Sequence, residues 1–361
     1  MSYEILVNEL TKRKEKVYQY LNSNKFQNIF RPQHIYDSVY SYMKYGGKAL
    51  RPSVLLFSCG AVGGDEDKVL PAAAAIEVFH TWTIVHDDII DRDNKRRGGP
   101  TVHEEFKNRA INELGYSQEE AKHYGSSIAM LAGDMQQGWA VSMLSDLTFV
   151  KCFDPLLVLY LIKDSELRVQ SELIEGQVLD IQYSKAPISS ITEEQITKVL
   201  WKKTGVLYEF CGKAGAMLGL NTTDDQHHLV KAISSFTSNC GIAFQLQDDI
   251  LGIVGDEQLL GKPVGSDIKE GKRTIILFHA YQNANEKQRM TIENTFGNKK
   301  AGNKSIDRAK KLLKELGSID YAKQIARSYV EKSLAYLDEI PNSKYKDLLY
   351  LWAQYMIERE F

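Results

Sequence analysis

Helical periodicity of the apolar residues is the feature that most constrains how this chain folds. Residues 305–316 set an apolar stripe opposite lysines and glutamates, and Gly317 follows as a stop signal. Residues 345–360 repeat that spacing, whereas alternating strands joined by hairpin turns are hard to find. The chain has only 8 prolines, several of them where helices are expected to begin or end, and no repeat or long linker. We expect one large all-α domain over residues 1–361.

Charge and cysteine usage exclude several classes of protein. Lys and Arg number 45 against 47 Asp and Glu, so the net charge of −2 lacks the basic excess of a nucleic-acid binder. The four cysteines are far apart and form no CxxC pair, as expected for free thiols in a reducing compartment. The N-terminus has no apolar core of a signal peptide, and the longest apolar run, residues 69–79, is too short to span a bilayer. We expect a cytoplasmic protein with no stable membrane insertion.

An apolar helix that ends in carboxylates is the first candidate for chemistry. Residues 71–91 are rich in Ala and apolar side chains and end in Asp87, Asp88 and Asp91, with Asp93 just beyond. Asp87 and Asp91 are four apart and share a helical face, where like charges destabilise a helix unless something compensates them. A hard divalent cation such as Mg²⁺ is the natural candidate, because it binds one or two carboxylates together with phosphate oxygens. The alternative is a solvated acidic helix end, although acidic residues there oppose the helix dipole.

Basic residues flank this helix in the sequence. Arg96 and Arg97 follow it, and arginine forks suit phosphate oxygens. Upstream, residues 45–52 read YGGKALRP, with Lys48 and Arg51 at the start of an apolar run. Glycine-rich helix starts also hold anions through their backbone amides. Metal and arginine together would grip one diphosphate, whereas the alternative is a set of surface ion pairs.

A second apolar helix repeats the arrangement near the other end of the chain. Residues 241–252, GIAFQLQDDILG, place Gln245 and Asp248 on one face with Asp249 beside it. The loop over residues 260–274 contains glycines among four cations and suits a lid over a diphosphate. Those cations are Lys262, Lys269, Lys272 and Arg273. Between the two acidic helices lies KKTG, residues 202–205, which alone predicts only a polar turn. Together the two helices indicate two walls of one metal–diphosphate site.

In this order the motifs resemble the trans-prenyl diphosphate synthases, most closely the archaeal-type geranylgeranyl diphosphate synthases. The motifs are GGKALRP, FHTWTIVHDDIIDRDNKRRGGPTVH, LAGD, EGQVLDI, KKTG, FQLQDDI and GKPVGSDIKEGKRT. The resemblance is strong over residues 40–280 and weak in the C-terminal helices. It implies an isoprenoid-synthase bundle of helices around a deep central cavity, present as a homodimer. It also implies condensation of isopentenyl diphosphate with an allylic diphosphate (dimethylallyl, geranyl or farnesyl), head to tail.

The resemblance also assigns site residues, by matching each motif to this sequence. Isopentenyl diphosphate is expected at Lys48, Arg51, His80 and Arg97. Roughly two or three magnesium ions per active site are expected at Asp87, Asp88, Asp91, Asp248 and Asp249. The allylic diphosphate is expected at Arg96, Lys203, Thr204, Gln245, Lys262 and Lys272. Of these, the expected catalytic set is the five aspartates with Arg96, Lys203, Thr204 and Lys262. Gln177 and Asp180 match a motif on the cavity wall that supports the metal cluster.

Two departures from the family pattern stand out. The second acidic motif is often DDxxD, but its last position here is Gly252, as in archaeal-type members, and we expect activity to survive. Residues 103–131 are longer than usual, and we interpret residues 112–120 as a surface extension.

Product length is expected to depend on residues just before the first acidic motif. Thr83, four before Asp87, lies near its helical face, whereas Trp82 points about 140° away at roughly 100° per residue. Geometry alone therefore favours packing of Trp82 on a neighbouring helix. The resemblance instead puts it, with Phe79 as the alternative, at the cavity floor. Small Thr83 favours geranylgeranyl diphosphate, and bulky Trp82 makes farnesyl diphosphate the second choice.

Four other functions share parts of this pattern. A class I terpene cyclase has the ionisation chemistry but a different second metal motif, and a longer-chain synthase differs only in cavity depth. A squalene-type coupling enzyme would have no use for GGKALRP. A non-catalytic regulatory subunit is expected to lose its metal aspartates, whereas both clusters are present here.

Overall fold

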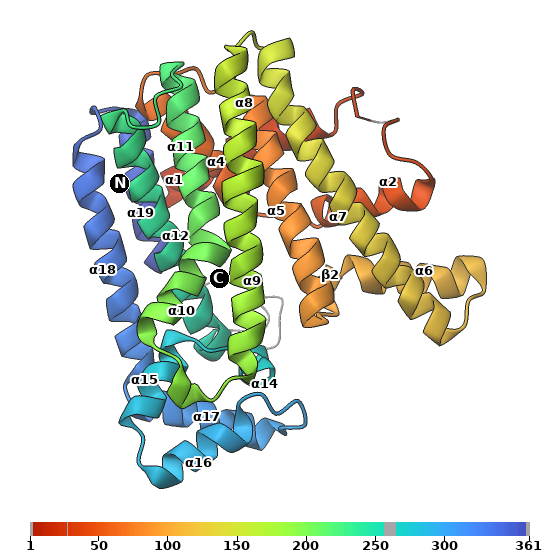
Figure 1. The fold of residues 1–361 in the computed structure, drawn as a ribbon, viewed down its shortest axis with the longest axis vertical. Coiled ribbons are helices and arrows are strands. Elements are labelled where there is room, and N and C mark those ends of the chain that lie inside the picture. Colours follow the sequence, from red (N-terminus) through yellow and green to blue (C-terminus); the bar gives the residue numbers. More distant parts are fainter. Residues whose placement is uncertain (1–2, 27, 256–264, 359–361) are drawn as a thin grey trace. The chain divides into compact units, whose positions relative to one another are not determined.

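The chain is almost entirely helical in its computed structural model, which describes residues 3–26, 28–255 and 265–358 (Figure 1). Within those ranges the only strands are β1 (Lys95–Arg96) and β2 (Gly99–Pro100). They pair antiparallel, with Arg96 opposite Gly99. The predicted all-α class is therefore confirmed. Among the described helices, none is both long enough and apolar enough to cross a membrane.

The chain falls into two compact units, each described here by itself. Unit 1 is Met1–Ile162 with Met217–Thr223, and unit 2 is Lys163–Ala216 with Asp224–Phe361. One domain over the whole chain stays a prediction, and so does the deep central cavity.

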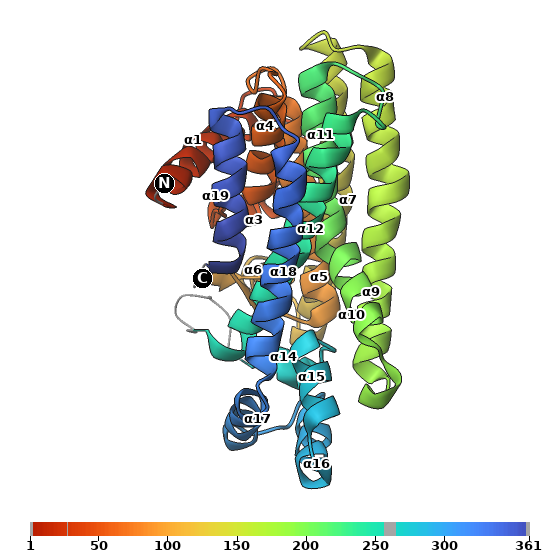
Figure 2. The ribbon, with the colours of Figure 1, turned by 90° about the vertical axis from the view of Figure 1, so that its left-hand side faces the viewer.

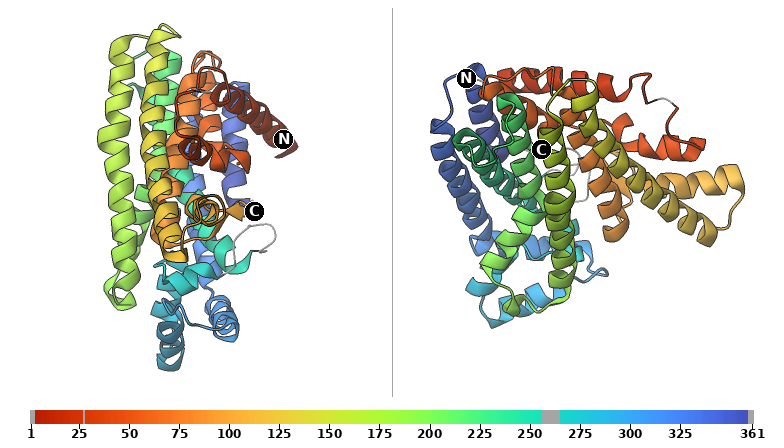
Figure 3. Two further views of the ribbon diagram at one scale, coloured as in Figure 1. Left: turned by 90° about the vertical axis from the view of Figure 1, so that its right-hand side faces the viewer. Right: turned by 45° about the horizontal axis from the view of Figure 1, so that its top comes forward.

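Unit 1 is organised around two long helices. Its helices are α1 (Tyr3–Leu21), α2 (Gln33–Val39), α3 (Ser41–Lys44), α4 (Leu50–Ala61), α5 (Leu70–Asp91), α6 (Val102–Leu114), α7 (Gln118–Phe149) and α8 (Pro155–Lys163). Helix α5 packs along α7, and α6 folds back on the first half of α7 (Figure 1). The views in Figure 3 show the orange α5 beside the yellow α7 from two further sides.

Small and aromatic side chains fill the interior of unit 1. The four alanines that open α5 are buried, as is nearly every residue of α4, because small side chains let neighbouring helices approach closely. On α7, Trp139 lies at the centre of an aromatic cluster. Its ring centroid is 5.1 Å from those of Phe26 and Phe30 and 5.4 Å from that of Tyr40. The acidic end of α5 is thereby held on a well-packed body.

Unit 2 contains the remaining helices. They are the π-helix η1 (Asp164–Val169), α9 (Gln170–Lys185), the 3₁₀-helix η2 (Ile188–Ser190), α10 (Glu193–Leu200), the π-helix η3 (Trp201–Gly205), α11 (Val206–Leu220, whose last turn belongs to unit 1), α12 (His228–Val254), α14 (Ser266–Glu270), α15 (Ile275–Asn283), α16 (Glu286–Thr295), α17 (Asn303–Glu315), α18 (Ser318–Asp338) and α19 (Lys344–Glu358). Figure 2 shows α12 packed beside α18, with α19 against both.

The core of unit 2 is aliphatic and surrounds α12. Ile242, Leu246, Ile250 and Ile253 repeat at helical spacing and are buried against α15, α17 and α18. Capping fixes where several surrounding helices begin; Thr192, for example, forms a capping box with Gln195 at the start of α10. The second acidic motif thus sits on a helix that packs into the core of its unit.

Several sequence predictions of local structure are confirmed. Residues 305–316 lie in α17 up to its end at Glu315, and Gly317 follows with a positive φ of 69°. Residues 345–358 lie in α19. Residues 112–120 are all exposed where α6 turns into α7, as predicted for a surface extension. The polar segment before α17 ends at Gly302, because α17 begins at Asn303.

Two glycines of α7 are expected to respond in opposite directions to alanine. A Cβ at Gly125 would lie 2.2 Å from the backbone oxygen of His103 on α6, and a backbone atom cannot easily move away. Gly125→Ala is therefore expected to lower the free energy of unfolding by about 1–3 kcal/mol. A Cβ at Gly138 would have no atom within 4 Å, so Gly138→Ala is expected to raise it by about 0.5–1 kcal/mol. Urea denaturation of both variants measures this, and equal effects would contradict the packing of α6 on α7.

Candidate active site

The end of α5 carries a buried carboxylate held by an arginine. The β1–β2 hairpin follows α5 and returns Arg96 to Asp88, whose Oδ1 accepts a hydrogen bond from Arg96 Nε at 2.9 Å. The Arg96 NH2 group also pairs with Asp88, and Tyr42 donates its hydroxyl to Asp88 Oδ2. Asp88 is fully buried, so this bidentate pairing is what makes its burial tolerable. Asp88 therefore fixes the guanidinium of Arg96 in place.

Asp87 and Asp91 lie differently from Asp88. Both are partly exposed on another face of the last turns of α5, as their spacing predicted. The helix ends at Asp91, where Arg92 has a φ of 62°. Asp93 comes next, and its carboxylate lies 3.4 Å from Arg96. The Asp88 oxygens contact protein groups in the interior, whereas the Asp87 and Asp91 side chains are only partly buried.

The paired glycines before α4 make room for Arg97. Arg97 NH1 donates to the backbone oxygen of Gly46 at 2.5 Å. A Cβ at Gly47 would lie 2.8 Å from that same NH1 nitrogen, so only glycine lets the guanidinium lie across the backbone there. Gly46 has a φ of 72°, which also favours glycine. The glycines thus place Arg97 beside exposed Lys48, as a pair of cations at the start of α4.

A neutral histidine joins α5 to α4. Arg51 NH1 lies 3.0 Å from His80 Nε2, and because a guanidinium only donates, Nε2 must accept and the ring proton sits on Nδ1. Burial, together with the nearby Arg51, Arg97 and Arg96, holds the pKa of His80 well below its usual value. The four residues predicted for isopentenyl diphosphate thus come from three segments of unit 1: Lys48 and Arg51 from the start of α4, His80 from the middle of α5 and Arg97 from the turn of the hairpin.

In unit 2 the KKTG segment is tied to two helices. Lys203 Nζ pairs with Asp180 of α9 at 2.6 Å, and Thr204 donates to Gln245 Oε1 of α12 at 2.7 Å. Gln245 in turn donates to Asp249 Oδ1 at 3.1 Å. These contacts connect Thr204 to the second acidic motif and Lys203 to α9, which the order of the motifs in the sequence did not show.

The first lysine of KKTG has a different environment from the second. Lys202 is buried and pairs with Glu172 and with Glu175 of α9, the latter at 2.8 Å. A Cβ at Gly176 would lie 2.7 Å from Lys202 Cβ, so this glycine lets η3 approach α9. Gln177 has a buried amide nitrogen without a hydrogen-bond partner among the described residues. Glu175, Gly176 and Asp180 of the EGQVLDI motif thus all contact the KKTG segment.

Asp267 is a site residue that sequence reasoning missed. Burial and the nearby Asp267 raise the pKa of Asp249 to about 8. A Cβ at Gly252 would lie 2.7 Å from Asp267 Oδ2, so the Asp267 carboxylate occupies space beside the position where a DDxxD motif has its last aspartate. Lys272 pairs with Asp267 at 3.2 Å. Asp267 is part of the GKPVGSDIKEGKRT motif, and this membership was the sequence feature that could have identified it as a site residue. The predicted Lys262 lies outside the described residues.

The crowded carboxylates fit a divalent cation. No three His, Cys, Asp or Glu side chains form a ready metal cage within the described ranges. However, Asp249 is buried beside Asp267 and Asp248, and these surroundings raise its pKa. A bound cation would lower that pKa and keep the carboxylate ionised. Oxygen-only donors of this kind suit Mg²⁺.

The three residues expected to set product length lie on two faces of α5. Trp82 and Phe79 are buried, with ring centroids 5.0 Å apart, and Trp82 also contacts His86 at 6.0 Å. His86 rests on α7, since a Cβ at Gly133 of the LAGD motif would lie 2.0 Å from its Nε2. Thr83 is partly buried and donates to the backbone oxygen of His80 at 2.8 Å. Trp82 thus lies on the face of α5 beside α7, as helical geometry predicted.

Comparisons with known proteins agree with the motifs. The family model for Polyprenyl synthetase matches residues 32–315. A geranylgeranyl diphosphate synthase of Methanosarcina mazei is 35% identical, covering 92% of both chains. Geranylgeranyl pyrophosphate synthetase from Pyrococcus horikoshii has a similar structure, with a TM-score of 0.81, 35% identity and 99% of each chain covered. So has geranylgeranyl pyrophosphate synthase from Corynebacterium glutamicum complexed with isoprenyl diphosphate and magnesium, with a TM-score of 0.81 and 28% identity over 99% of this chain and 98% of that one. By sequence and by fold, this chain belongs to the polyprenyl synthetase family.

Proposed function

We propose that the protein is a trans-prenyltransferase that condenses isopentenyl diphosphate with an allylic diphosphate head to tail, with geranylgeranyl diphosphate as its main product. The observation that carries the proposal is the pair of acidic groups, one in each unit, each with cations fixed beside it. Membership of the polyprenyl synthetase family supports the reaction. The neighbour complexed with isoprenyl diphosphate and magnesium supports both the substrate class and the cofactor.

Fixed positive charge supplies the chemistry that such a reaction needs. An allylic C–O bond ionises when the leaving diphosphate is neutralised, and Mg²⁺ supplies part of that neutralisation when bound. Arg96, held by Asp88, adds a guanidinium that needs no reorganisation during the reaction. Lys203 and Lys272 add two ammonium groups, each already anchored on a carboxylate. We assign these three cations to the allylic diphosphate, with Thr204, Gln245 and Lys262.

The second diphosphate needs its own cations, so that the two reacting carbons are oriented toward each other. Lys48, Arg51 and Arg97 lie at the start of α4 with neutral His80 between α5 and α4, and we assign this group to isopentenyl diphosphate. We find no side chain suited to be a general base, so the released diphosphate is our candidate for removing the proton. Asp87, Asp91, Asp248 and Asp249 are our proposed ligands for roughly two or three magnesium ions per active site. For Asp88 the structure favours a role in holding Arg96.

We also propose a homodimer, which agrees with rows of exposed apolar side chains. On α7 these are Met130, Leu131 and Met135, and on α9 they are Ile174, Val178 and Ile181. Each of these side chains is between 38% and 51% exposed. They are grouped at helical spacing, and grouped apolar side chains, unlike single ones, are typical of an interaction surface. We place the dimer in the cytoplasm.

Activity is expected to need a divalent metal and both acidic helices. Asp87→Ala and Asp248→Ala are each expected to cut turnover by about 10³-fold or more, since each removes part of the metal-held charge. Asp307→Ala, which removes an exposed carboxylate of α17, is the matched control and should leave turnover unchanged. Steady-state assays over a range of magnesium concentrations measure this, and near-normal turnover of either variant in excess magnesium would sink the assignment.

The two groups of cations are expected to separate kinetically. Arg51→Ala removes a guanidinium assigned to isopentenyl diphosphate, so KM for that substrate should rise by roughly tenfold or more. KM for the allylic substrate should change much less. If the allylic KM rises instead, the two diphosphate assignments are reversed.

The neutral state of His80 predicts a pH dependence of stability. Its pKa in the folded protein is below its ordinary value of 6.5, so the unfolded chain takes up the proton first as the pH falls. Stability is therefore lost as the pH drops below about 6.5, by at most about 1.4 kcal/mol per pH unit from this group. His80→Gln should reduce this slope in urea denaturation between pH 7 and pH 5. An unchanged slope would show that His80 is not held neutral.

Product length tests the assignment of the cavity floor. Trp82→Ala is expected to deepen the cavity and lengthen the main product, whereas Trp82→Phe keeps an aromatic ring and should retain geranylgeranyl diphosphate. Reversed-phase chromatography of labelled products measures the distribution. If Trp82→Ala folds normally and makes the same products, another residue such as Phe79 sets the depth.

A further inference from the structure

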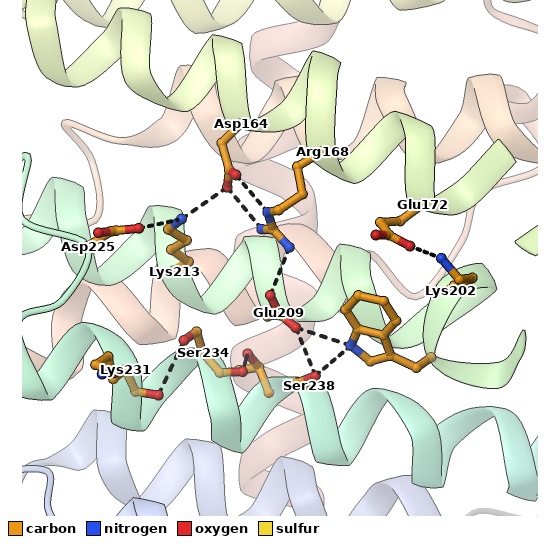
Figure 4. Close-up of polar contacts among 12 residues, drawn as sticks. Asp164, Arg168, Glu172, Lys202, Glu209, Lys213, Asp225, Lys231, Ser234 and Ser238 are labelled. Atoms are coloured by element: carbon orange, nitrogen blue, oxygen red, sulfur yellow. Dashed lines mark hydrogen bonds and ion pairs between the residues drawn. The ribbon is translucent and has the colours of Figure 1, made fainter. Parts of the chain in front are cut away.

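A latch of polar contacts lies in unit 2 beside the KKTG segment (Figure 4). It begins at Trp201, the first residue of the π-helix η3. The indole Nε1 donates to Glu209 Oε2 on α11 at 3.1 Å and to Ser238 Oγ on α12 at 3.0 Å. The ring covers the other end of η3, since a Cβ at Gly205 would lie 2.9 Å from Trp201 Cδ1. Trp201 therefore holds both ends of the five-residue π-helix.

Glu209 is the acceptor on which the latch depends. Its Oε2 also accepts from Ser238 Oγ at 3.1 Å, and its Oε1 accepts from Arg168 NH1 at 2.9 Å. An ionised carboxylate satisfies three donors at once because it only accepts. A glutamine there would face either Arg168 or Trp201 with an N–H group. The charge of Glu209 is thus built into the arrangement.

The same carboxylate connects η3 to the other π-helix of unit 2. Arg168 belongs to η1, and it also pairs with Asp164 at 2.7 Å. Lys213 of α11 lies 3.3 Å from Asp164, which closes the network around α11 (Figure 4). Asp164 has its pKa lowered: burial alone would raise it, but Arg168 and Lys213 outweigh that effect. Both π-helical segments are therefore fastened to one helix through Glu209.

A π-helix is rare and holds one residue more per turn than an α-helix, so it needs a specific cause to persist. If η3 relaxed to an α-helix, the register after Trp201 would shift by about one residue, or roughly 100° around the axis. Lys203 and Thr204 would then turn away from Asp180 and Gln245, with which they now pair at 2.6 and 2.7 Å.

We propose that Trp201 and Glu209 are positioning residues that keep η3 in its π-helical form and so aim Lys203 and Thr204 at the allylic diphosphate. The inference rests on the proposed function in one respect, the assignment of Lys203 and Thr204 to that substrate. Neither Trp201 nor Glu209 need touch the substrate, because each acts through the backbone of η3.

The test uses the full-length enzyme with Trp201→Phe, which removes the N–H donor and keeps a ring, and Glu209→Gln, which removes the charge. Both are expected to raise KM for geranyl diphosphate or lower kcat, so that kcat/KM for this substrate falls by roughly 10–100-fold. KM for isopentenyl diphosphate should stay within about twofold. Glu293→Gln is the matched control, because Glu293 accepts a hydrogen bond from Tyr281 on the surface of α16. It should behave as the wild type.

A double-variant cycle separates positioning from general stability. If Glu209 acts mainly through Lys203, adding Glu209→Gln to the Lys203→Ala variant should lower kcat/KM for geranyl diphosphate by less than about threefold further. Full additivity, or equal losses for both substrates with a lowered Tm, would overturn the proposal in favour of a structural role. Normal kinetics of Trp201→Phe and Glu209→Gln beside an impaired Lys203→Ala would overturn the latch and leave the proposed function standing. A fully active Lys203→Ala would overturn the assignment of Lys203 and the latch together.

Discussion

Carboxylates gathered at the ends of apolar helices must be compensated by cations, and most of the local structure follows from that constraint. In unit 1 the buried Asp88 is compensated internally by Arg96, which the short hairpin returns to it. In unit 2 it is incomplete: Lys203 and Lys272 each pair with a carboxylate, yet the pKa of Asp249 remains raised to about 8. A metal ion on the second group would remove that deficit.

Glycines make these contacts sterically possible. Gly47 lets Arg97 cross the backbone, Gly133 admits His86 onto α7, and Gly176 brings Lys202 against α9. In each case a Cβ would stand closer than 3.0 Å to an atom of the neighbouring segment. The glycines within the GGKALRP, LAGD and EGQVLDI motifs therefore act by letting helices and loops approach, so that charged side chains reach their partners.

Periodicity and motifs predicted the fold class and several helix ends, because apolar stripes and glycine stops are local features of the sequence. Helical spacing also predicted that Asp87 and Asp91 share a face and that Trp82 lies on another. Asp267 and the Trp201–Glu209 latch were not predicted, since both depend on contacts between different helices: Asp267 of α14 with α12, and Trp201 with Glu209 of α11 and Ser238 of α12. The π-helical form of η3 was missed for the same reason: KKTG alone indicates only a polar turn, and the latch that fixes it lies on α11 and α12.

The central claim is that the protein elongates a linear isoprenoid chain. Incubating the purified protein with magnesium, labelled isopentenyl diphosphate and each allylic primer in turn, followed by chromatography of the products, tests it most directly. The account predicts incorporation of label from every primer shorter than the product, with geranylgeranyl diphosphate accumulating. Conversion of an allylic diphosphate to a cyclic hydrocarbon without incorporation of labelled isopentenyl diphosphate would contradict it.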